Sequence, residues 1–162
     1  KIILDQEFEQ NEFKKNLIKT GLGITEIYNH EKKNDKFDFL FLCYGGMLEE
    51  TLKAATKLFI EEELTSKILL PNQINPIEEQ LVDEIFSNNF KKLVVVEENT
   101  TDNSWGTLIF SNLVKKSKSI RLSITDIILL GSSSELISAN IKKEKENLID
   151  ADKIYNYLVD IL

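Results

Sequence analysis

The stretch FDFLFLCYGGMLEETLKAATKLF, residues 37–59, decides the fold of this chain. Up to Tyr44 it holds one strongly polar residue, Asp38, and polar and apolar side chains do not alternate. A run of this kind is typical of a strand buried on both faces, as in a parallel sheet. Beyond Gly45-Gly46, apolar residues recur at the spacing of an amphipathic helix. Strand, glycine turn and helix in this order begin a βαβ unit.

The chain downstream repeats this pattern. The segment KILL at residues 67–70 and the continuous apolar run at residues 93–96 predict two more buried strands, with a helix between them. Asn75, Pro76 and Glu78 have the spacing of a capping box, which places the start of this helix at Asn75. The next helix is expected to follow Trp105.

Towards the C-terminus, the alternating residues 120–124 predict an edge strand, and residues 125–134 are expected to be irregular. Thr125 and Asp126 are thus the residues at the carboxyl end of this predicted strand. A terminal helix is expected to begin after Asp150 as its N-cap. The apolar residues of this helix are expected to pack on the domain: Ile154, Tyr157, Leu158 and Ile161.

At the N-terminus, residues 21–28 predict a strand. Residues 1–20 are expected to be an extension or the tail of a preceding domain. Because the chain starts without an initiator Met, we expect it to be part of a longer protein. Residues 21–162 then form one three-layer α/β/α domain, since parallel strands joined by helical crossovers place helices on both faces of a sheet.

Composition excludes several classes of protein. The chain has 162 residues, a net charge of −7 and a single arginine, Arg121, which argues against a nucleic-acid-binding protein. No apolar run approaches the ~20 residues of a membrane span. The single cysteine, Cys43, permits no internal disulfide, and this indicates a reducing compartment such as the cytoplasm.

The Gly45-Gly46 turn is the first candidate site. It precedes a predicted helix N-terminus, where free N–H groups and the helix dipole favour an anion, so Gly45, Gly46 and Met47 form a candidate anion or regulatory site. The alternative is a tight turn alone. No phosphate-binding glycine motif is present, and Glu49 and Glu50 in the first helical turn repel phosphate.

Acidic residues and a tryptophan follow the third buried strand. Glu97, Glu98 and Asp102 could do acid–base work or hold a hard cation, or they could be solvated or packed on another subunit. Trp105 could anchor an interface or pack in the core. Because no second histidine accompanies His30, a histidine-based metal site or catalytic triad has no support. Cys43 lies within the predicted buried strand and is interpreted as a core residue.

Four of these segments, in this order, resemble one protein family. They are FLCYGGM with its helix, INPI, LVVVEEN with WG downstream, and the closing IYNYLVDIL. From Gly21 to Leu162 the chain resembles the C-terminal domain shared by transketolases and the beta chains of 2-oxo-acid dehydrogenases, such as pyruvate dehydrogenase. Two segments of this chain are most like the beta chains. They are the end of the strand, with Tyr44, Gly45 and Met47, and the VEE segment.

This resemblance implies a five-stranded, mostly parallel sheet of order 1-3-2-4-5 with an antiparallel first strand. It also implies a parent enzyme that uses thiamine diphosphate with magnesium and forms a homodimer or heterotetramer. In such enzymes other domains hold the cofactor and the catalytic residues, so none are expected here. Two departures put an inherited anion site in doubt: Asn103-Ser104 replaces a glycine pair, and Asn72-Gln73 stands where an arginine is frequent.

The expected function is therefore that of an assembly or regulatory domain, not catalytic by itself. The candidate interface residues are Glu97, Glu98, Asn99, Trp105, Asp160 and Leu162. The resemblance implies a basic acyltransferase binding domain as one partner near the C-terminus, whereas a merely solubilising role for the acidic surface is the alternative. The other function class is a free-standing module that binds a small ligand or anion and shares only the fold.

Overall fold

The stretch that predicted the fold forms β3 (Lys36–Cys43) and α2 (Met47–Glu62) in the computed structural model. The structure describes residues 18–20, 23–28, 36–100, 104–116, 126–132 and 147–162. Side chains of β3 alternate between two hydrophobic clusters: Phe39, Phe41 and Cys43 face one, and Leu40 and Leu42 face the other. All five are fully buried, so this strand packs on both faces, as its unbroken apolar run predicts.

The described strands form a single six-stranded sheet of order β1-β2-β4-β3-β5-β6. Neighbouring β3, β4, β5 and β6 run parallel, whereas β2 is antiparallel to β4. The strands other than β3 are β1 (Ile18–Thr20), β2 (Ile24–Tyr28), β4 (Ser66–Pro71), β5 (Asn89–Thr100) and β6 (Ile127–Ser132).

This topology confirms the expected fold. Strands β2, β3, β4, β5 and β6 are the five of the predicted order 1-3-2-4-5, with the first antiparallel. The short β1 adds a sixth strand, which pairs antiparallel with β2 and belongs to the residues predicted to be an extension. The predicted division at residue 20 stays a prediction.

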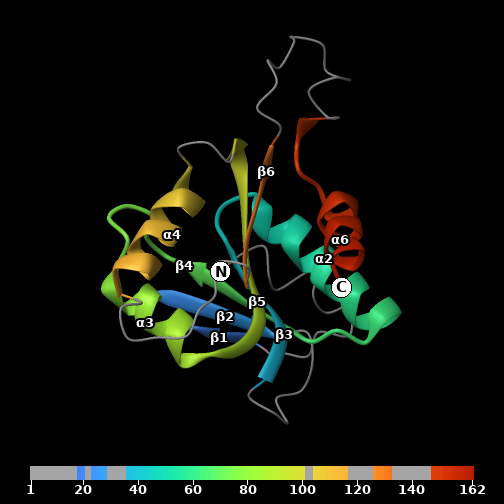
Figure 1. Cartoon of the computed structure of the whole chain (residues 1–162), viewed down its shortest axis with the longest axis horizontal. Helices are drawn as coiled ribbons and strands as arrows, with labels where there is room; N and C mark the ends of the chain where they lie inside the picture. The colour runs from blue at the N-terminus through green and yellow to red at the C-terminus, as the bar shows by residue number, and fades with distance from the viewer. Residues whose placement is uncertain (1–17, 21–22, 29–35, 101–103, 117–125, 133–146) are drawn as a thin grey trace.

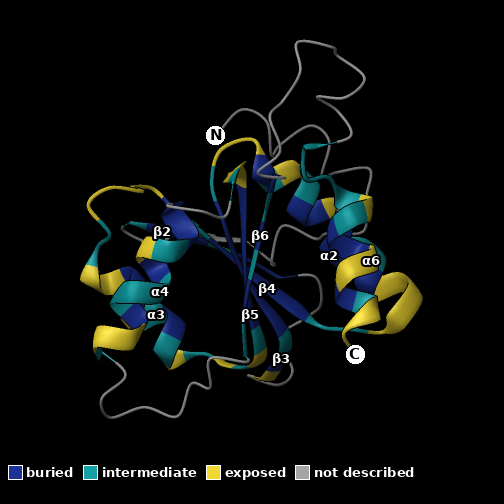
Figure 2. Cartoon of the chain, turned by 45° about the horizontal axis from the view of Figure 1, so that its top comes forward, coloured by how far each residue is buried: buried dark blue, intermediate teal, exposed yellow. Residues whose placement is uncertain are grey.

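Helices cover both faces of the sheet (Figure 1). On one face lie α2 and α6 (Ala151–Asp160), and on the other lie α3 (Glu79–Ser87) and α4 (Trp105–Lys116). The buried residues gather in the sheet and on the inner sides of the helices (Figure 2). None of the helices in the described ranges combines the length and apolar character needed to cross a membrane.

The start of α3 was predicted wrongly. The helix begins at Glu79 rather than after Asn75, because its N-cap residue Glu78 has an extended backbone, with φ −70° and ψ 139°. The Asn75–Pro76 peptide bond is cis. The segment before the helix makes other hydrogen bonds: Gln73 donates to the Pro76 carbonyl over 3.3 Å, and the Trp105 indole donates to the Ile74 carbonyl over 2.8 Å.

The prediction for residues 125–134 was also wrong. Residues 125–134, expected to be irregular, contain β6, whereas the predicted strand at 120–124 lies outside the described residues. β6 forms because Leu93–Val96 of β5 offers a parallel pairing edge to Ile127–Leu130. Asp126 therefore lies at the amino end of β6, where it forms an ion pair of 3.2 Å with Lys92, and not at a carboxyl end.

The predicted terminal helix is confirmed as α6, but two residues that were expected on its buried face are exposed. Asp150 is its N-cap, and its side chain accepts a 2.8 Å hydrogen bond from the Lys153 N–H, as predicted. Tyr157 and Ile161 were expected to pack down but are 47% and 41% exposed. Tyr155 is buried in their place, because its hydroxyl lies against Glu61 and Glu62 at the end of α2.

Candidate functional site at the carboxyl end of the sheet

The candidate site lies where the chain direction switches. β3 continues through α2 to β4 on one side, and its neighbour β5 continues through α4 to β6 on the other side. In open α/β sheets, ligands bind in the crevice outside the carboxyl ends of two such strands. At this point the structure brings together the turn after β3 and the Glu97–Asn99 end of β5, both of which the sequence singled out.

The turn after β3 is built on two glycines. Gly45 has a φ of +56°, a conformation that glycine adopts readily, and Gly46 is the N-cap of α2 without a capping side chain. The Met47 and Leu48 N–H groups each donate over 3.3 Å to the carbonyls of Tyr44 and Gly45. Both glycines are exposed, while the Met47 side chain is buried.

The N-terminus of α4 is filled by a carboxylate of the chain itself. Glu97 is fully buried, and its two carboxylate oxygens accept hydrogen bonds of 3.0 Å from the Trp105 and Gly106 N–H groups. Ser104, which precedes the helix, accepts from the Thr107 N–H over 3.4 Å through its hydroxyl and from the Leu108 N–H over 3.3 Å through its carbonyl. Three N–H groups that the helix start leaves without an intrahelical partner, those of Trp105, Gly106 and Thr107, are therefore satisfied by side chains of the protein itself.

Trp105 anchors this end of the domain from the inside. Its indole ring meets Tyr44 edge to face, with ring centroids 5.0 Å apart, and its indole N–H binds the Ile74 carbonyl. The side chain is 7% exposed, so the core-packing interpretation of Trp105 agrees with the structure. Burial, and next the charges of Glu97 and Glu98, raise the pKa of the neighbouring Tyr44 hydroxyl.

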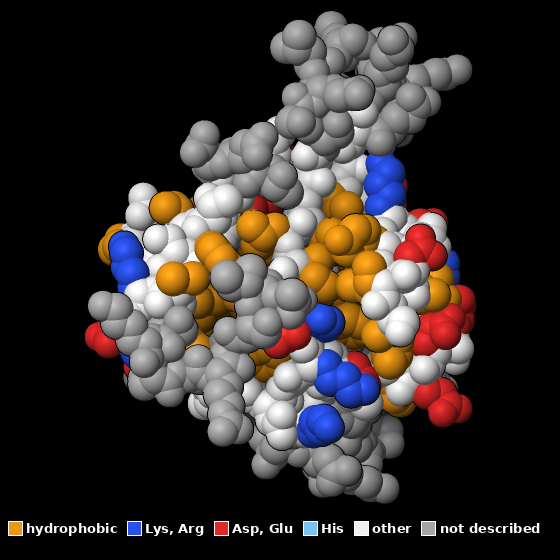
Figure 3. All heavy atoms as spheres, viewed as in Figure 1, with side chains coloured by type: hydrophobic (Ala, Val, Ile, Leu, Met, Phe, Trp, Pro, Cys, Tyr) orange, Lys and Arg blue, Asp and Glu red, His pale blue; other side chains and the backbone are white. Residues whose placement is uncertain are grey.

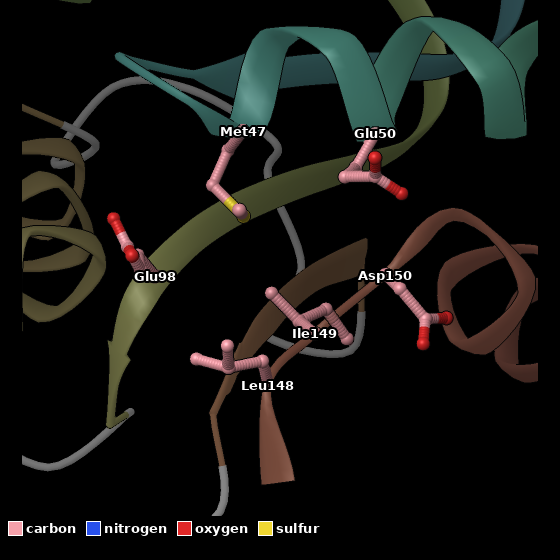
Figure 4. Close-up of a pocket in the computed structure, with 6 residues that line it drawn as sticks. All are labelled: Met47, Glu50, Glu98, Leu148, Ile149 and Asp150. Atoms are coloured by element: carbon pink, nitrogen blue, oxygen red, sulfur yellow. The ribbon is translucent and has the colours of Figure 1, made fainter. Parts of the chain in front are cut away.

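A cavity of about 370 Å³ opens beside the turn, between α2, the end of β5 and the start of α6 (Figure 4). Its apolar wall consists of Met47, Leu148 and Ile149, and three acidic residues complete the lining: Glu50, Glu98 and Asp150. Figure 4 shows the Met47 side chain pointing into the space between Glu98 and the Leu148-Ile149 segment. The cavity thus unites one residue of the predicted anion site with one of the predicted interface.

Two of the three acids are engaged within the protein. Glu50 accepts a 2.9 Å hydrogen bond from the Ala151 N–H at the start of α6, and it forms a 3.0 Å ion pair with Lys53. Asp150 caps the same helix. Glu98 is exposed at the mouth of the cavity. Among the described residues, the lining carries carboxylates and no lysine or arginine, so it suits a neutral or cationic group better than an anion.

The remaining predicted residues are spread over the molecule. Glu97 is inside the protein, and Asn99 is exposed beside Glu98. Asp160 and Leu162 are exposed at the far end of α6, and the structure does not bring them to the cavity. His30 and Asp102 lie outside the described residues. Within the described ranges, no group of three or more His, Cys, Asp or Glu side chains could hold a metal ion.

Some site residues were missed by the sequence. Leu148 and Ile149 line the cavity because they lead into α6, and only the fold brings this segment to α2. The link from Glu50 to Ala151 likewise joins residues that are far apart in sequence. A local sequence signal was present only for the start of α4. Ser104 stands three residues before Thr107 and accepts its N–H, as an N-cap residue does.

A family described as "Transketolase, C-terminal domain" matches residues 29–148, most of the chain. The chain belongs to this family. The match includes the Gly45-Gly46 turn, Glu97 and Trp105, so most of the candidate site of this transketolase C-terminal domain lies within the matched region; Ile149 and Asp150 of the cavity lie just beyond it. A comparison with curated proteins finds no match.

Two solved structures have a similar fold. One is a split-gene transketolase, an inactive beta4 tetramer, with a TM-score of 0.58 and 16% identity over 76% of this chain and 38% of that one. The other is 2-oxoglutarate:ferredoxin oxidoreductase from Magnetococcus marinus, with a TM-score of 0.52 and 18% identity over 85% of this chain and 19% of that one. The chain therefore spans well under half the length of either protein.

Proposed function

We propose that this chain is the association domain of a thiamine-diphosphate-dependent enzyme, either like a 2-oxo-acid dehydrogenase beta chain or like a transketolase. Its membership of the transketolase C-terminal family and its fold support this function. The domain packs against other domains or subunits of a homodimer or heterotetramer and holds neither cofactor nor substrate. The lone, buried Cys43 fits a reducing compartment, and we infer that the parent enzyme is cytoplasmic.

One observation carries the non-catalytic part of the proposal. The chain's own carboxylates occupy the N-termini of two helices at this end of the sheet, Glu97 at α4 and both Glu50 and Asp150 at α6. At the third helix, α2, no side chain caps the N-terminus, but Glu49 and Glu50 lie in its first turn. A diphosphate placed there would lack free N–H groups at α4 and α6 and would face like charges. The cofactor would then be bound by another part of the enzyme, and this domain would contribute to assembly.

Calorimetric titration of the chain with thiamine diphosphate and magnesium tests this proposal. We expect no saturable heat from the chain alone and micromolar binding by the complete parent enzyme. Saturable binding by the chain alone would overturn the association role. Magnesium chloride without cofactor is the matched control, because it separates binding of the diphosphate from binding of the cation to the acidic surface.

The cavity supports a second candidate function, a free-standing module that binds a small ligand. Its acidic and apolar lining selects a neutral or cationic molecule with an apolar part. The coding sequence around this chain separates the two functions. A pyrimidine-binding domain in the same gene or a neighbouring one favours the association domain, whereas a single short gene favours the module.

A further inference from the structure

We propose that Glu97 acts as an internal ligand, whose carboxylate closes an anion-binding position at the start of α4, and that removing this side chain opens the position to acetate. The inference concerns the chain's own architecture and does not depend on the proposed function. It starts from the contacts of Glu97, which resemble those of a bound anion at a helix N-terminus.

The contacts are those of a bidentate ligand. One oxygen of Glu97 accepts from the Gly106 N–H and the other from the Trp105 N–H, both over 3.0 Å. The Glu97 side chain is fully buried, so solvent does not compete for these hydrogen bonds. Charged acceptors bind N–H donors more strongly than neutral ones, and the positive end of the helix adds to the attraction.

The space around the carboxylate is closely fitted. A Cβ atom on Gly106 would lie 2.7 Å from the Glu97 Oε1, 3.1 Å from the Leu129 Cδ2 and 3.3 Å from the Val95 Cγ1. Only a residue without a side chain allows the carboxylate to approach the helix backbone at this point. The Glu97→Ala change removes a methylene carbon and a carboxylate group, and acetate contains the same groups with one more hydrogen. Acetate therefore matches the vacated space in shape and in charge.

The fluorescence of Trp105 reports directly on this position, because Trp105 is the only tryptophan of the chain and its backbone N–H donates to Glu97. Tyr44, in edge-to-face contact with Trp105, supplies a second readout. The charge of Glu97 helps to raise the pKa of the Tyr44 hydroxyl, after the effect of burial. Loss of the carboxylate should lower the pKa of Tyr44, and bound acetate should raise it again.

The experiment titrates the Glu97→Ala chain with sodium acetate, and with sodium chloride at equal ionic strength. We expect a saturable change of Trp105 fluorescence at millimolar acetate, and a progressive rise of the thermal unfolding midpoint by mass action. Chloride should produce neither effect. The wild type and Glu98→Ala, which alters an exposed neighbour, should not respond to acetate beyond the chloride control.

Glu97→Gln keeps the shape and fills the position, so it should unfold at a lower temperature than the wild type without rescue by acetate. If Glu97→Ala does not fold in chloride, recovery of folded protein on refolding in acetate supports the proposal. A Glu97→Ala chain that responds alike to acetate and chloride, folded or during refolding, would overturn it. So would an equal response of Glu98→Ala to acetate.

Discussion

At the scale of single residues, the acidic side chains near the carboxyl end of the sheet have a common role. Glu97, Glu50 and Asp150 each accept a backbone N–H at the start of a helix. A carboxylate in this position satisfies a donor that the helix leaves unpaired, and it interacts favourably with the helix dipole. The cluster of acids that the sequence offered for acid–base chemistry thus has a structural explanation at Glu97.

Gly106 should not tolerate a side chain. In Gly106→Ala the new Cβ would lie 2.7 Å from the Glu97 Oε1 and too close to Leu129. We expect the free energy of unfolding to fall by about 1–3 kcal/mol through overpacking, although alanine favours a helix over glycine by ~1 kcal/mol. Urea unfolding measures the change. Gly46→Ala is the control, since a Cβ there meets nothing within 4 Å and its φ is −63°; a Gly106→Ala chain as stable as this control would contradict the prediction.

Asp38 should make stability depend on pH. Its carboxylate accepts from the Thr65 N–H over 2.8 Å and pairs with Lys91 at 2.6 Å. Burial alone would raise the pKa of Asp38, but these contacts with Lys91 and Thr65 outweigh burial and hold the pKa below its usual value. A lowered pKa in the folded state means that the contribution is complete above the unfolded-state pKa of ~3.9 and is lost as pH falls through the folded-state pKa.

The Asp38→Asn variant measures this contribution. We expect it to be less stable than the wild type by about 1–2 kcal/mol at neutral pH, and the difference to shrink below pH ~4 as the wild-type carboxylate is protonated. Urea unfolding across this pH range gives the difference. The exposed Asp160→Asn serves as the control. A difference between wild type and Asp38→Asn that stays constant with pH would refute the assignment.

At the scale of elements, prediction succeeded where one local signal was sufficient. β3 and β5 each have an unbroken apolar run at their core, residues 39–43 and 93–96, and the glycine turn before α2 marks the change from strand to helix spacing, so these elements were predicted from sequence. The start of α3 failed because the capping-box pattern at Asn75 competes with long-range hydrogen bonds, including that of the Trp105 indole to Ile74. β6 was missed although residues 127–130, IILL, are themselves an unbroken apolar run, and its parallel pairing with β5 shows that this run is a strand.

The antiparallel strand β2 is joined to the rest of the sheet by a buried lysine. Lys67 on β4 is 3% exposed, and its ammonium lies 3.3 Å from Glu26 on β2 and 3.1 Å from Glu84 on α3. The Asn88 side chain accepts a further hydrogen bond of 2.8 Å. A sequence pattern reads Lys67 as an interruption of an apolar run, whereas the structure makes it a link between three elements.

Lys67→Met should therefore destabilise the protein although methionine is apolar. The change leaves the carboxylates of Glu26 and Glu84 without their partner, and breaking a buried pair in this way costs ~3–5 kcal/mol. We expect the lower end of this range, because both carboxylates are partly exposed. Thermal or urea unfolding measures the loss. Lys116→Met, which removes the half-buried partner of the exposed Glu79 and Asp83, is the matched control and should change stability far less, because solvent screens these pairs.

At the scale of the whole molecule, the two ends of α6 differ in character. Its start is tied to α2 through Glu50 beside the cavity, whereas its end exposes apolar and acidic groups together. Leu162 is 67% exposed, with Tyr157 and Ile161 also exposed on this helix, and Asp160 lies among them. Figure 3 shows hydrophobic side chains on the face of the molecule that Figure 1 views, with acidic side chains along its margin.

We predict that the end of α6 associates with a basic protein partner, the acyltransferase binding domain that the resemblance to dehydrogenase beta chains implies. The chain has a net charge of −7, which would steer a basic partner towards it. Such steering weakens with ionic strength, because the Debye length falls from ~10 Å at 0.1 M salt to ~3 Å at 1 M. Exposed apolar groups would add contacts that salt does not screen.

Titration of the binding domain of the parent enzyme's candidate acyltransferase, at low and high salt, measures the association. Asp160→Asn should weaken binding mainly at low salt, whereas a chain lacking Ile161 and Leu162 should bind more weakly at both. Asp83→Asn, which removes a similar charge from α3 on the opposite face of the sheet, should bind like the wild type. Each variant thus reports on a different contribution to binding, because electrostatic attraction is long-range whereas apolar burial requires direct contact. Binding that is indifferent to salt, to Asp160→Asn and to the truncation would mean that the acidic surface serves only solubility and that the partner, if it binds, uses another face.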